Sequence, residues 1–455
     1  MNKELNRIHF IAMGGSVMHQ LAIALAREGR NITGSDDEFF EPSKSLLEKS
    51  GLLPVKAGWF AEKITDKLDA VILGMHARRD NPELQKAFEL TIPIYSFPEF
   101  IYLHSKDKQR FVISGSHGKT TITAMIIHVL NYYKKEFDYV IGAKVDGLDS
   151  WVKLSDAPVI ILEGDEYASS PLDKTPKFMK YKHHIGVING IAWDHMNIFH
   201  TEEAYLRAFE DFADATPKAG SLFYCEEDSL TSMIGIKQRV DVNSIEYKSF
   251  PFETKNGNIF IKDETELFPV KVFGKHNMQN MGAAQAVLRR LGISSKEFLQ
   301  AMGSFTGASS RLEVLAQTKS ATVYKDYAHS PSKVLATMDA VREQHPGIKF
   351  IACFELHTYS SLNSEFIKNY KDSLNKADQA IVYYNQETSL HKKLNPLTSE
   401  EIKNSFNNEK LAIVNNSSDL KAQLDSLSGT FVLLLMSSGN FGELNLKEIA
   451  QKITS

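Results

Sequence analysis

The stretch that most constrains this chain is residues 111–121, Phe-Val-Ile-Ser-Gly-Ser-His-Gly-Lys-Thr-Thr. It opens with a short apolar run of β-forming residues, Phe111–Ile113, which predicts a buried strand. Residues 120–130 are typical of a helix that is buried on most sides. A strand, a glycine turn and a helix in this order predict a phosphate-binding loop. The turn directs backbone N–H groups inward, and the helix N-terminus adds partial positive charge.

The residue types in this turn suit nucleotide chemistry. Lys119 can meet terminal phosphates, and the Thr120 hydroxyl can ligate Mg²⁺. The spacing is G-x-x-G-K-T rather than the commoner G-x-x-x-x-G-K-[ST], so a purely structural turn is the alternative. His117 is either a solvent-facing loop histidine or a group aimed at the transferred phosphoryl or its acceptor. The predicted nucleotide-binding residues of the turn are Gly115, Ser116, Gly118, Lys119, Thr120 and Thr121.

The N-terminal region has the pattern of half a Rossmann unit. A strand at 8–13 is followed by a turn at Gly14-Gly15-Ser16, a helix at Val17–Glu28 and a second strand that ends at Asp36. The full G-x-G-x-x-G is absent, so a nucleoside diphosphate is a better candidate than a dinucleotide. His76 and Arg78 follow another strand, Ala70–Gly74, and either face a ligand or belong to a solvated loop. The polar stretch 98–108 is expected to lead into the next domain.

Carboxylates gather after the buried strand 158–162. Glu163, Asp165 and Glu166 could share Mg²⁺, which prefers oxygen ligands and offsets their mutual repulsion; a solvated acidic turn is the alternative. A further strand, His184–Asn189, leads to Asp194-His195. His195 could be a second metal ligand, although an isolated histidine is more often structural.

The remainder of the chain predicts a small β region and a third α/β domain. Short strands are expected from Tyr224 to Phe273, and an alanine-rich helix at Met281–Leu291. The amides of Asn277 and Asn280 suit a base edge or a helix cap. Strands then alternate with helices, which implies a mostly parallel Rossmann-like sheet. The strands are expected at 321–324, 349–354, 379–384 and 430–436, and the clearest helices at 332–344, 364–376 and 418–427.

Composition is that of an ordinary globular chain. The 455 residues suggest about three domains, and 43% are hydrophobic and 24% charged. The net charge of −4 gives no basic field for nucleic acid. The two cysteines, Cys225 and Cys353, match no disulfide or metal spacing, which favours a reducing cytoplasm. No apolar run reaches the roughly 18–20 residues of a membrane span, and the N-terminal apolar stretch stops too early for a signal peptide.

The order of these stretches resembles the Mur ligase family over essentially the whole chain. The matching pieces are the Gly14-Gly15 turn, Gly115–Thr121, Glu163–Tyr167, Asp194-His195, Gly274–Asn280, Arg311-Leu312-Glu313 and Asp326–Pro331. The resemblance implies three α/β domains: a UDP-sugar-binding Rossmann-like domain at 1–107, an ATP-binding P-loop domain at 108–311 and a Rossmann-like acceptor domain at 312–455. It also implies ATP-dependent amide formation on UDP-N-acetylmuramate through an acyl phosphate, by a monomer or weak homodimer.

The resemblance also implies residue roles. Lys119, His117, His195 and Arg311 would be catalytic, with Mg²⁺ held by Thr120, Glu163 and His195. ATP would further engage Asn277, Asn280, Arg311 and Asp326. The UDP-sugar and acceptor side would use Gly14, Gly15, Ser16, Met18, Asp36, His76, Arg78 and His329, the last as a guess for the base.

The acceptor is the least determined part. Tyr167, the segment 173–181 and the loop 439–442 favour the tripeptide L-Ala-γ-D-Glu-meso-diaminopimelate. The alternative acceptor is L-alanine, and 173–181 could be an ordinary surface segment. Ser330 and His357-Thr358 depart from the family's pattern on the acceptor side, and Ala192 and Asn197 replace usual acidic residues around Asp194-His195. The alternatives to this activity are a folate-type amino-acid ligase and a binding protein that hydrolyses ATP without forming an amide.

Overall fold

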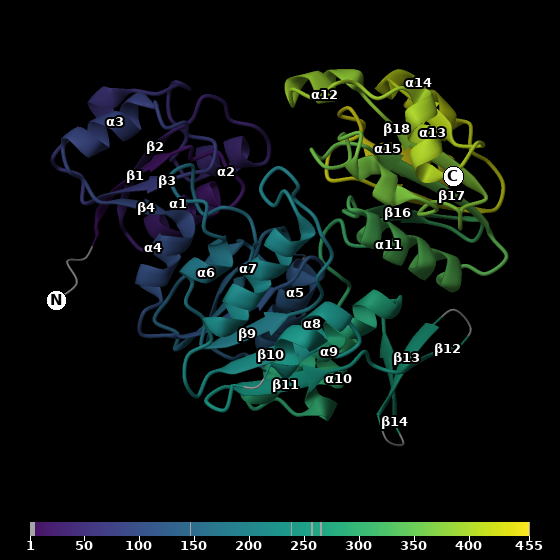
Figure 1. Ribbon diagram of the computed structural model, residues 1–455, viewed down its shortest axis with the longest axis horizontal. Coiled ribbons are helices and arrows are strands. Elements are labelled where there is room, and N and C mark those ends of the chain that lie inside the picture. The colour runs from purple at the N-terminus through teal and green to yellow at the C-terminus, as the bar shows by residue number, and fades with distance from the viewer. Residues whose placement is uncertain (1–4, 146, 238, 256–257, 264–265, 455) are drawn as a thin grey trace. The chain divides into compact units, whose positions relative to one another are not determined.

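The computed structural model describes residues 5–145, 147–237, 239–255, 258–263 and 266–454 (Figure 1). The chain forms two compact units. The first runs to Gly190 and includes Arg207–Tyr247, and the second consists of Ile191–Leu206 and the chain from Lys248 onward. No helix in the described ranges is both long and apolar enough to cross a membrane.

The first unit begins with a four-stranded parallel sheet in the order β2-β1-β3-β4. Alternate residues of β1 and β3 pack on α3, where Val71, Leu73, Leu84 and Ala87 form one buried cluster. The strands are β1 (Arg7–Ile11), β2 (Asn31–Ser35), β3 (Ala70–Leu73) and β4 (Ile94–Ser96), and the helices are α1 (Met18–Arg27), α2 (Ser43–Lys49), η1 (Ala61–Lys63), α3 (Pro82–Glu89) and α4 (Phe97–His104).

The stretch 98–108, which was predicted to lead into the next domain, is not polar throughout. Residues 97–104 form the helix α4, which buries Phe100 and Ile101. Ser96 and Glu99 make a capping box at its start, because each side chain bonds the other's backbone N–H. The spaced apolar residues and the cap together outweigh the polar residues of the segment.

A seven-stranded sheet, β11-β10-β9-β5-β8-β6-β7, forms the rest of the first unit and is parallel except where β7 pairs with β6. Because β5 lies between β8 and β9, the loops after these three strands meet at one edge. The elements are β5 (Gln109–Ser114), α5 (Lys119–Tyr132), β6 (Asp138–Val140), β7 (Val152–Lys153), β8 (Val159–Glu163), α6 (Lys177–Lys180), β9 (Ile185–Ile188), β10 (Ser221–Cys225), α8 (Ser229–Ile236) and β11 (Asn243–Tyr247); α7 (Glu202–Asp214) crosses the boundary of the two units.

The expected short strands of 224–273 are interrupted by a helix. The strand β10 already starts at Ser221, and α8 separates it from β11. Asp228 caps α8 through the backbone N–H of Thr231, which is a local helix-start signal. Only β12 (Phe252–Lys255), β13 (Asn258–Asp263) and β14 (Glu266–Val270) form the antiparallel sheet of the second unit that this region predicted (Figure 1).

The helix α9 (Lys275–Arg290) starts six residues before the predicted Met281. Gly274 precedes it with φ of 86°, a conformation that favours glycine. Asn277 and Asn280 therefore lie inside the helix rather than ahead of it. The helix α10 (Ser295–Met302) follows.

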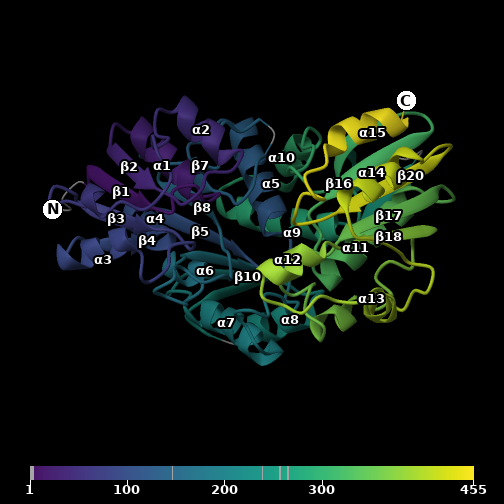
Figure 2. The same cartoon turned by 90° about the horizontal axis from the view of Figure 1, so that it is seen from above.

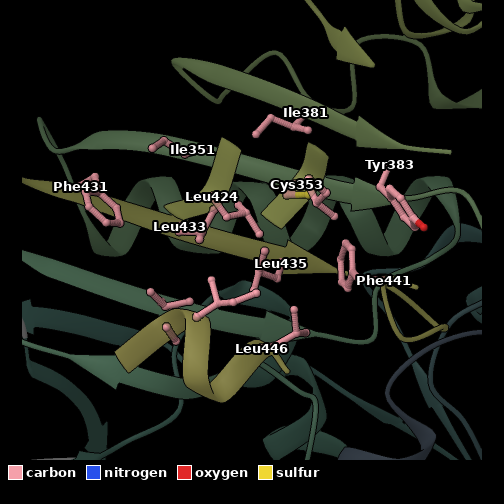
Figure 3. Packing of buried hydrophobic residues seen from close by; sticks show 14 of the residues in the cluster. Ile351, Cys353, Ile381, Tyr383, Leu424, Phe431, Leu433, Leu435, Phe441 and Leu446 are labelled. Atoms are coloured by element: carbon pink, nitrogen blue, oxygen red, sulfur yellow. The ribbon is translucent and has the colours of Figure 1, made fainter. Parts of the chain in front are cut away.

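The second unit ends in a six-stranded sheet, β15-β16-β20-β17-β18-β19, which is parallel except for the edge strand β15. On one face, Cys353 and Leu433 pack with Leu424 and Leu446 from α14 and α15 (Figure 3). Figure 2 shows α11 and α13 on the other face. The elements are β15 (Glu313–Gln317), β16 (Ala321–Asp326), α11 (Pro331–Gln344), β17 (Lys349–Glu355), η2 (Phe366–Tyr370), β18 (Gln379–Tyr383), α12 (Gln386–His391), α13 (Ser399–Phe406), β19 (Ala412–Val414), α14 (Ser417–Asp425), β20 (Phe431–Met436) and α15 (Leu446–Thr454).

The predicted helix at 364–376 is wrong, because only the short 3-10 turn η2 forms there. Lys371 is extended, with ψ of 129°, and Asp372 has φ of 62°, so the backbone cannot continue as a helix. The turn already buries Phe366 and Tyr370, and Tyr370 packs its ring on Phe354. The predicted α/β class with mostly parallel sheets is confirmed.

Candidate active site

The loop between β5 and α5 has the backbone of a phosphate-binding turn. Gly115 and Gly118 have φ of 131° and 79°, which side chains disfavour. The Ser116 N–H donates to the Gly190 carbonyl at 2.8 Å, so the loop rests on the segment after β9. Lys119, Thr120 and Thr121 form the first turn of α5, and both threonines are buried. The loop therefore leads directly into the N-terminus of α5, and helix N-termini favour the binding of anions.

Lys119 is held in place by two oxygen partners. Its Nζ lies 2.5 Å from Glu166 Oε2 and 2.6 Å from the Gly115 carbonyl oxygen. Burial opposes the lysine charge, but Glu166 and Asp165 outweigh it and hold the pKa of Lys119 above its ordinary value. Lys119 therefore stays charged at neutral pH. A fixed ammonium at a helix start is suited to the terminal phosphates of a nucleotide.

Glu163 lies beside Thr120 at the end of β8. The Thr120 hydroxyl donates to Glu163 Oε1 at 2.7 Å, and the Gly142 N–H donates to Oε2 at 2.7 Å. A hydroxyl and a carboxylate are hard oxygen donors, and Mg²⁺ commonly takes one or two protein oxygens together with phosphates and water. The donor set therefore fits Mg²⁺ bound with a nucleotide.

Two of the three carboxylates that were predicted to share the metal have lysine partners in the structure. Asp165 pairs with Lys177 at 2.7 Å, and Glu166 pairs with Lys119. Lysine ammonium groups balance these charges, whereas Glu163 accepts a hydrogen bond from the Thr120 hydroxyl. Among the described residues, no group of three or more His, Cys, Asp or Glu side chains could hold a metal ion.

His117 lies in the loop and is half-buried. Its ring packs on Gly190, where an added Cβ would come within 2.4 Å of the ring. The alternative of a purely solvent-facing histidine therefore does not describe this side chain. Its ring is placed against the backbone beside the phosphate loop.

The predicted UDP-binding turn meets Asp36 at the edge of the first sheet. The Gly14 N–H donates to Asp36 Oδ2 at 2.7 Å, because β1 and β2 are adjacent and parallel. Burial raises the pKa of Asp36 to about 7, and the neighbouring Asp37 adds to the shift. The other predicted residues differ in exposure: Gly15 is half-buried, Met18 is buried at the start of α1, and Ser16, His76 and Arg78 are exposed.

In the second unit, Asp326 binds backbone rather than pointing freely outward. Its Oδ2 accepts the Leu312 N–H and its Oδ1 the Ala328 N–H, both at 2.7 Å. The Arg311 guanidinium stacks on the Tyr327 ring, 4.5 Å from its centroid. Asp326 therefore holds the turn that carries Arg311 against the end of β16.

Asp194 contacts the ring of His329 and accepts the backbone N–H of His195. Asp194 Oδ1 accepts the His195 N–H at 2.7 Å, and its Oδ2 lies 3.6 Å from His329 Nε2 and 3.5 Å from Lys333 Nζ. Burial would raise the pKa of Asp194, but Lys333 and His329 outweigh it and hold that pKa well below its ordinary value. Burial also lowers the pKa of His329, which favours its neutral form.

Asn277 and Asn280 are buried on α9 and bond each other. Asn277 Nδ2 donates to the Phe273 carbonyl at 2.8 Å, and Asn280 Nδ2 donates to Asn277 Oδ1 at 3.3 Å. The cap of α9 is Gly274, so neither amide is the helix cap that was the alternative.

Sequence reasoning overlooked two residues beside the phosphate loop. Asn189 follows β9, and Tyr247 ends β11; Tyr247 donates to Asn189 Oδ1 at 2.7 Å. The available signal was a polar Asn189-Gly190 pair at the end of a buried strand. Without the strand order, nothing in the sequence places that pair next to Gly115.

Comparisons with known proteins match each part of the chain. Family models for the Mur ligase family catalytic domain, the Mur ligase middle domain and the Mur ligase glutamate ligase domain match residues 7–109, 113–288 and 310–439. A UDP-N-acetylmuramate–L-alanyl-γ-D-glutamyl-meso-2,6-diaminoheptandioate ligase of Haemophilus influenzae is 27% identical, over 97% of this chain and 98% of the relative.

Two further proteins bear on the family and the fold. A UDP-N-acetylmuramate–L-alanine ligase of Clostridium kluyveri is 30% identical, over 83% of this chain and 82% of the relative. The crystal structure of the UDP-N-acetylmuramate-alanine ligase of Thermotoga maritima matches with a TM-score of 0.73 at 23% identity, over 98% of each chain. The chain therefore belongs to the Mur ligase family, whose members are ATP-dependent ligases that form amide bonds.

Proposed function

We propose that this protein joins the lactyl carboxylate of UDP-N-acetylmuramate to the amine of L-Ala-γ-D-Glu-meso-diaminopimelate, using ATP. The observation that supports activation of the carboxylate by ATP is the Lys119 ammonium, which is held at the start of α5 beside the glycine turn. The tripeptide acceptor is supported by the Haemophilus influenzae relative, whose name includes this tripeptide as a substrate and which aligns with 97% of the chain. Residues 1–107, 108–311 and 312–455 are the proposed UDP-sugar, ATP and acceptor domains.

The chemical difficulty of this reaction is that a carboxylate must attack a phosphate, so two anions must approach. Fixed positive charge in a site that excludes water lowers this barrier. Lys119 and the loop N–H groups hold the β- and γ-phosphates, and His117 lies beside the transferring phosphoryl. Thr120, Glu163 and His195 are the residues that would hold Mg²⁺, which would further neutralise the phosphate charge. The acyl phosphate formed on the substrate is then attacked by the acceptor amine.

The roles of the remaining residues follow the same chemistry. Asn277, Asn280, Arg311 and Asp326 serve the nucleotide, Asp326 through the turn that carries Arg311. Gly14, Gly15, Ser16, Met18, Asp36, His76 and Arg78 serve the UDP-sugar. His329 is suited to accept a proton from the acceptor amine, because burial keeps it neutral.

The test is an acceptor competition. Purified protein, ATP, Mg²⁺ and UDP-N-acetylmuramate are incubated with an equimolar mixture of the tripeptide and L-alanine. The products are identified and quantified by mass spectrometry. We expect the tripeptide adduct to dominate. Phosphate release without any adduct would contradict the ligase proposal, and a dominant alanine adduct would transfer the assignment to the second candidate.

That second candidate, L-alanine as acceptor, is supported by the alanine ligase of Clostridium kluyveri at 30% identity. It shares the UDP-sugar, the ATP chemistry and every residue role above except the acceptor side. Omitting UDP-N-acetylmuramate is the matched control for both candidates, because neither adduct can form without it.

A further inference from the structure

The phosphate loop is hydrogen-bonded to the segment that follows the neighbouring strand β9. Three backbone or near-backbone bonds join the two ends: Ser114 Oγ to the Val187 carbonyl at 2.6 Å, the Asn189 N–H to the Ser114 carbonyl at 3.1 Å and the Ser116 N–H to the Gly190 carbonyl at 2.8 Å. The approach is close, since a Cβ at Gly115 would lie 3.0 Å from the Asn189 nitrogen. The loop is therefore shaped partly by residues 75 positions away in the chain.

One side chain adds to these bonds. Asn189 is fully buried, and its Nδ2 donates to the His117 carbonyl in the middle of the loop at 3.2 Å. Its Oδ1 accepts the Tyr247 hydroxyl at 2.7 Å. The amide thus uses its donor for the loop and its acceptor for the tyrosine.

The His117 carbonyl and the Tyr247 hydroxyl together determine which way the Asn189 amide points. An amide can be flipped with little change in shape, so its orientation follows from its partners. The Tyr247 hydroxyl is a donor here, and burial raises the pKa of Tyr247 well above its ordinary value, so that the proton stays on the oxygen. The His117 carbonyl can only accept a hydrogen bond, so Nδ2 faces His117, and Oδ1 then faces the Tyr247 hydroxyl, which donates to it.

We propose that Asn189, oriented by Tyr247, is a positioning residue that holds the His117 carbonyl and thereby keeps the phosphate loop in its nucleotide-binding conformation. This inference rests on the proposed function, in which the loop binds ATP. Neither residue acts on the reacting atoms. Their effect is on how much of the protein has a loop ready for phosphate, and a binding-competent fraction below one weakens the apparent affinity in proportion.

The first variant is Tyr247→Phe, which removes the hydroxyl and keeps the ring. We expect the KM and Kd for ATP to rise about three- to tenfold, as for the loss of one buried hydrogen bond, with the KM for UDP-N-acetylmuramate unchanged. Tyr139→Phe is the matched control, because Tyr139 is also buried in this sheet and donates to a carbonyl, that of Ser150, at 3.1 Å. The control should leave the ATP constants unchanged.

The second variant is Asn189→Asp. A carboxylate cannot donate to the His117 carbonyl, and it places negative charge beside the phosphate site, so the loss of ATP affinity should exceed that of Tyr247→Phe. Backbone amide hydrogen exchange over residues 115–119 should accelerate in both variants. If Asn189→Asp does not fold, the exchange rates and ATP constants of Tyr247→Phe decide the question alone.

The outcomes separate this inference from the proposed function. Calorimetry with a non-hydrolysable ATP analogue is performed first on the unaltered protein. If that protein does not bind the analogue, the proposed function is contradicted. If it binds, and Tyr247→Phe binds equally well with equal exchange rates at 115–119, the positioning role is overturned. A fall in melting temperature without any change in ATP affinity would also overturn it, because that is the result expected of a purely structural pair.

Discussion

Glu166 and Asp326 are both buried carboxylates at the carboxyl ends of strands, but they have different kinds of partner. Glu166 is in the first unit and balances one charge, the ammonium of Lys119. Asp326 is in the second unit and accepts two backbone N–H groups, those of Leu312 and Ala328. Glu166 holds the Lys119 side chain, for which we propose a function. Asp326 holds the backbone of the turn that carries Arg311.

This difference has energetic consequences. Removing one partner of a buried ion pair leaves an uncompensated charge, which costs roughly 3–5 kcal/mol. Removing a carboxylate that serves backbone donors leaves neutral N–H groups without partners, which costs roughly 1–3 kcal/mol each. Around Lys119, function and stability should therefore be separable by a compensating second substitution. At Asp326 they should change together, because its main partners are backbone N–H groups, which no substitution removes, and Thr337 is a neutral hydroxyl.

The largest expected effect is that of Lys119→Ala. Phosphate release should fall about 10³-fold or more, because the γ-phosphate loses its fixed counter-charge. The variant should also be less stable, since Glu166 is left buried without its lysine. Activity is measured by phosphate release and stability by urea unfolding.

The double variant Lys119→Ala/Glu166→Gln sharpens this result. It should regain stability but not activity, because the glutamine carries no charge. Lys177→Ala is the control, since it breaks the partly exposed pair with Asp165 in the same segment. Recovery of activity in the double variant would show that Lys119 only neutralises Glu166.

Asp326→Ala is expected to lower the free energy of unfolding by about 2–4 kcal/mol, because the Leu312 and Ala328 N–H groups lose their acceptor. Asp326→Asn keeps one acceptor oxygen and should lose about half as much. Urea unfolding measures both. Asp378→Ala, which removes an exposed carboxylate from the Phe350 N–H, should cost less. Equal losses for Asp326→Ala and Asp378→Ala would remove the distinction drawn between the two carboxylates.

His195→Ala tests a side chain that belongs to neither pattern. If His195 holds Mg²⁺, the Mg²⁺ concentration for half-maximal activity should rise about tenfold, equivalent to about 1.4 kcal/mol. The control is His200→Ala, an exposed histidine five residues further on. An unchanged Mg²⁺ titration in His195→Ala would identify this histidine as structural.

The last prediction concerns the pH dependence of stability and rests on Asp36, a third buried carboxylate, whose pKa burial raises from 3.8 to about 7. Between these values the folded state keeps a proton that the unfolded chain has released. Stability should therefore fall as pH rises from about 4 to about 7 and level off above that. Asp36→Asn removes the titration, so its stability relative to the unaltered protein should increase between about pH 5 and about pH 8.

Urea unfolding at the two pH values measures this difference. Glu38→Gln, an exposed carboxylate two residues away, should leave the pH dependence unchanged. A constant stability difference between Asp36→Asn and the unaltered protein at both pH values would show that Asp36 is ionised throughout this range.

Local patterns in the sequence allowed much of the fold to be predicted. The strand at 111–113 and the helix after Lys119 form as expected, because their apolar residues recur with the right period and glycine marks the turn. The segment 364–376 shows where this reasoning stops. Its apolar residues suit a helix, but their packing needs only the single turn η2.

The site could be predicted in the same unequal way. The turn residues Gly115–Thr121 are contiguous, so their arrangement is local and readable. The partners of Glu163, Asp165 and Glu166 could not be predicted, since Thr120, Lys177 and Lys119 are brought to them by the fold and not by a local sequence pattern. Three carboxylates at the end of one strand therefore have different partners.

The sequence by itself determined the α/β class, the phosphate turn and the family, because these depend on short-range periodicity and on the order of short motifs. Only the tertiary structure decided that Asn189 and Tyr247 support the turn and that Asp326 binds backbone. The physical reason is that strand order, which no local pattern encodes, decides which loops share an edge of a sheet. Partners distant in the chain can then satisfy one another's buried hydrogen bonds.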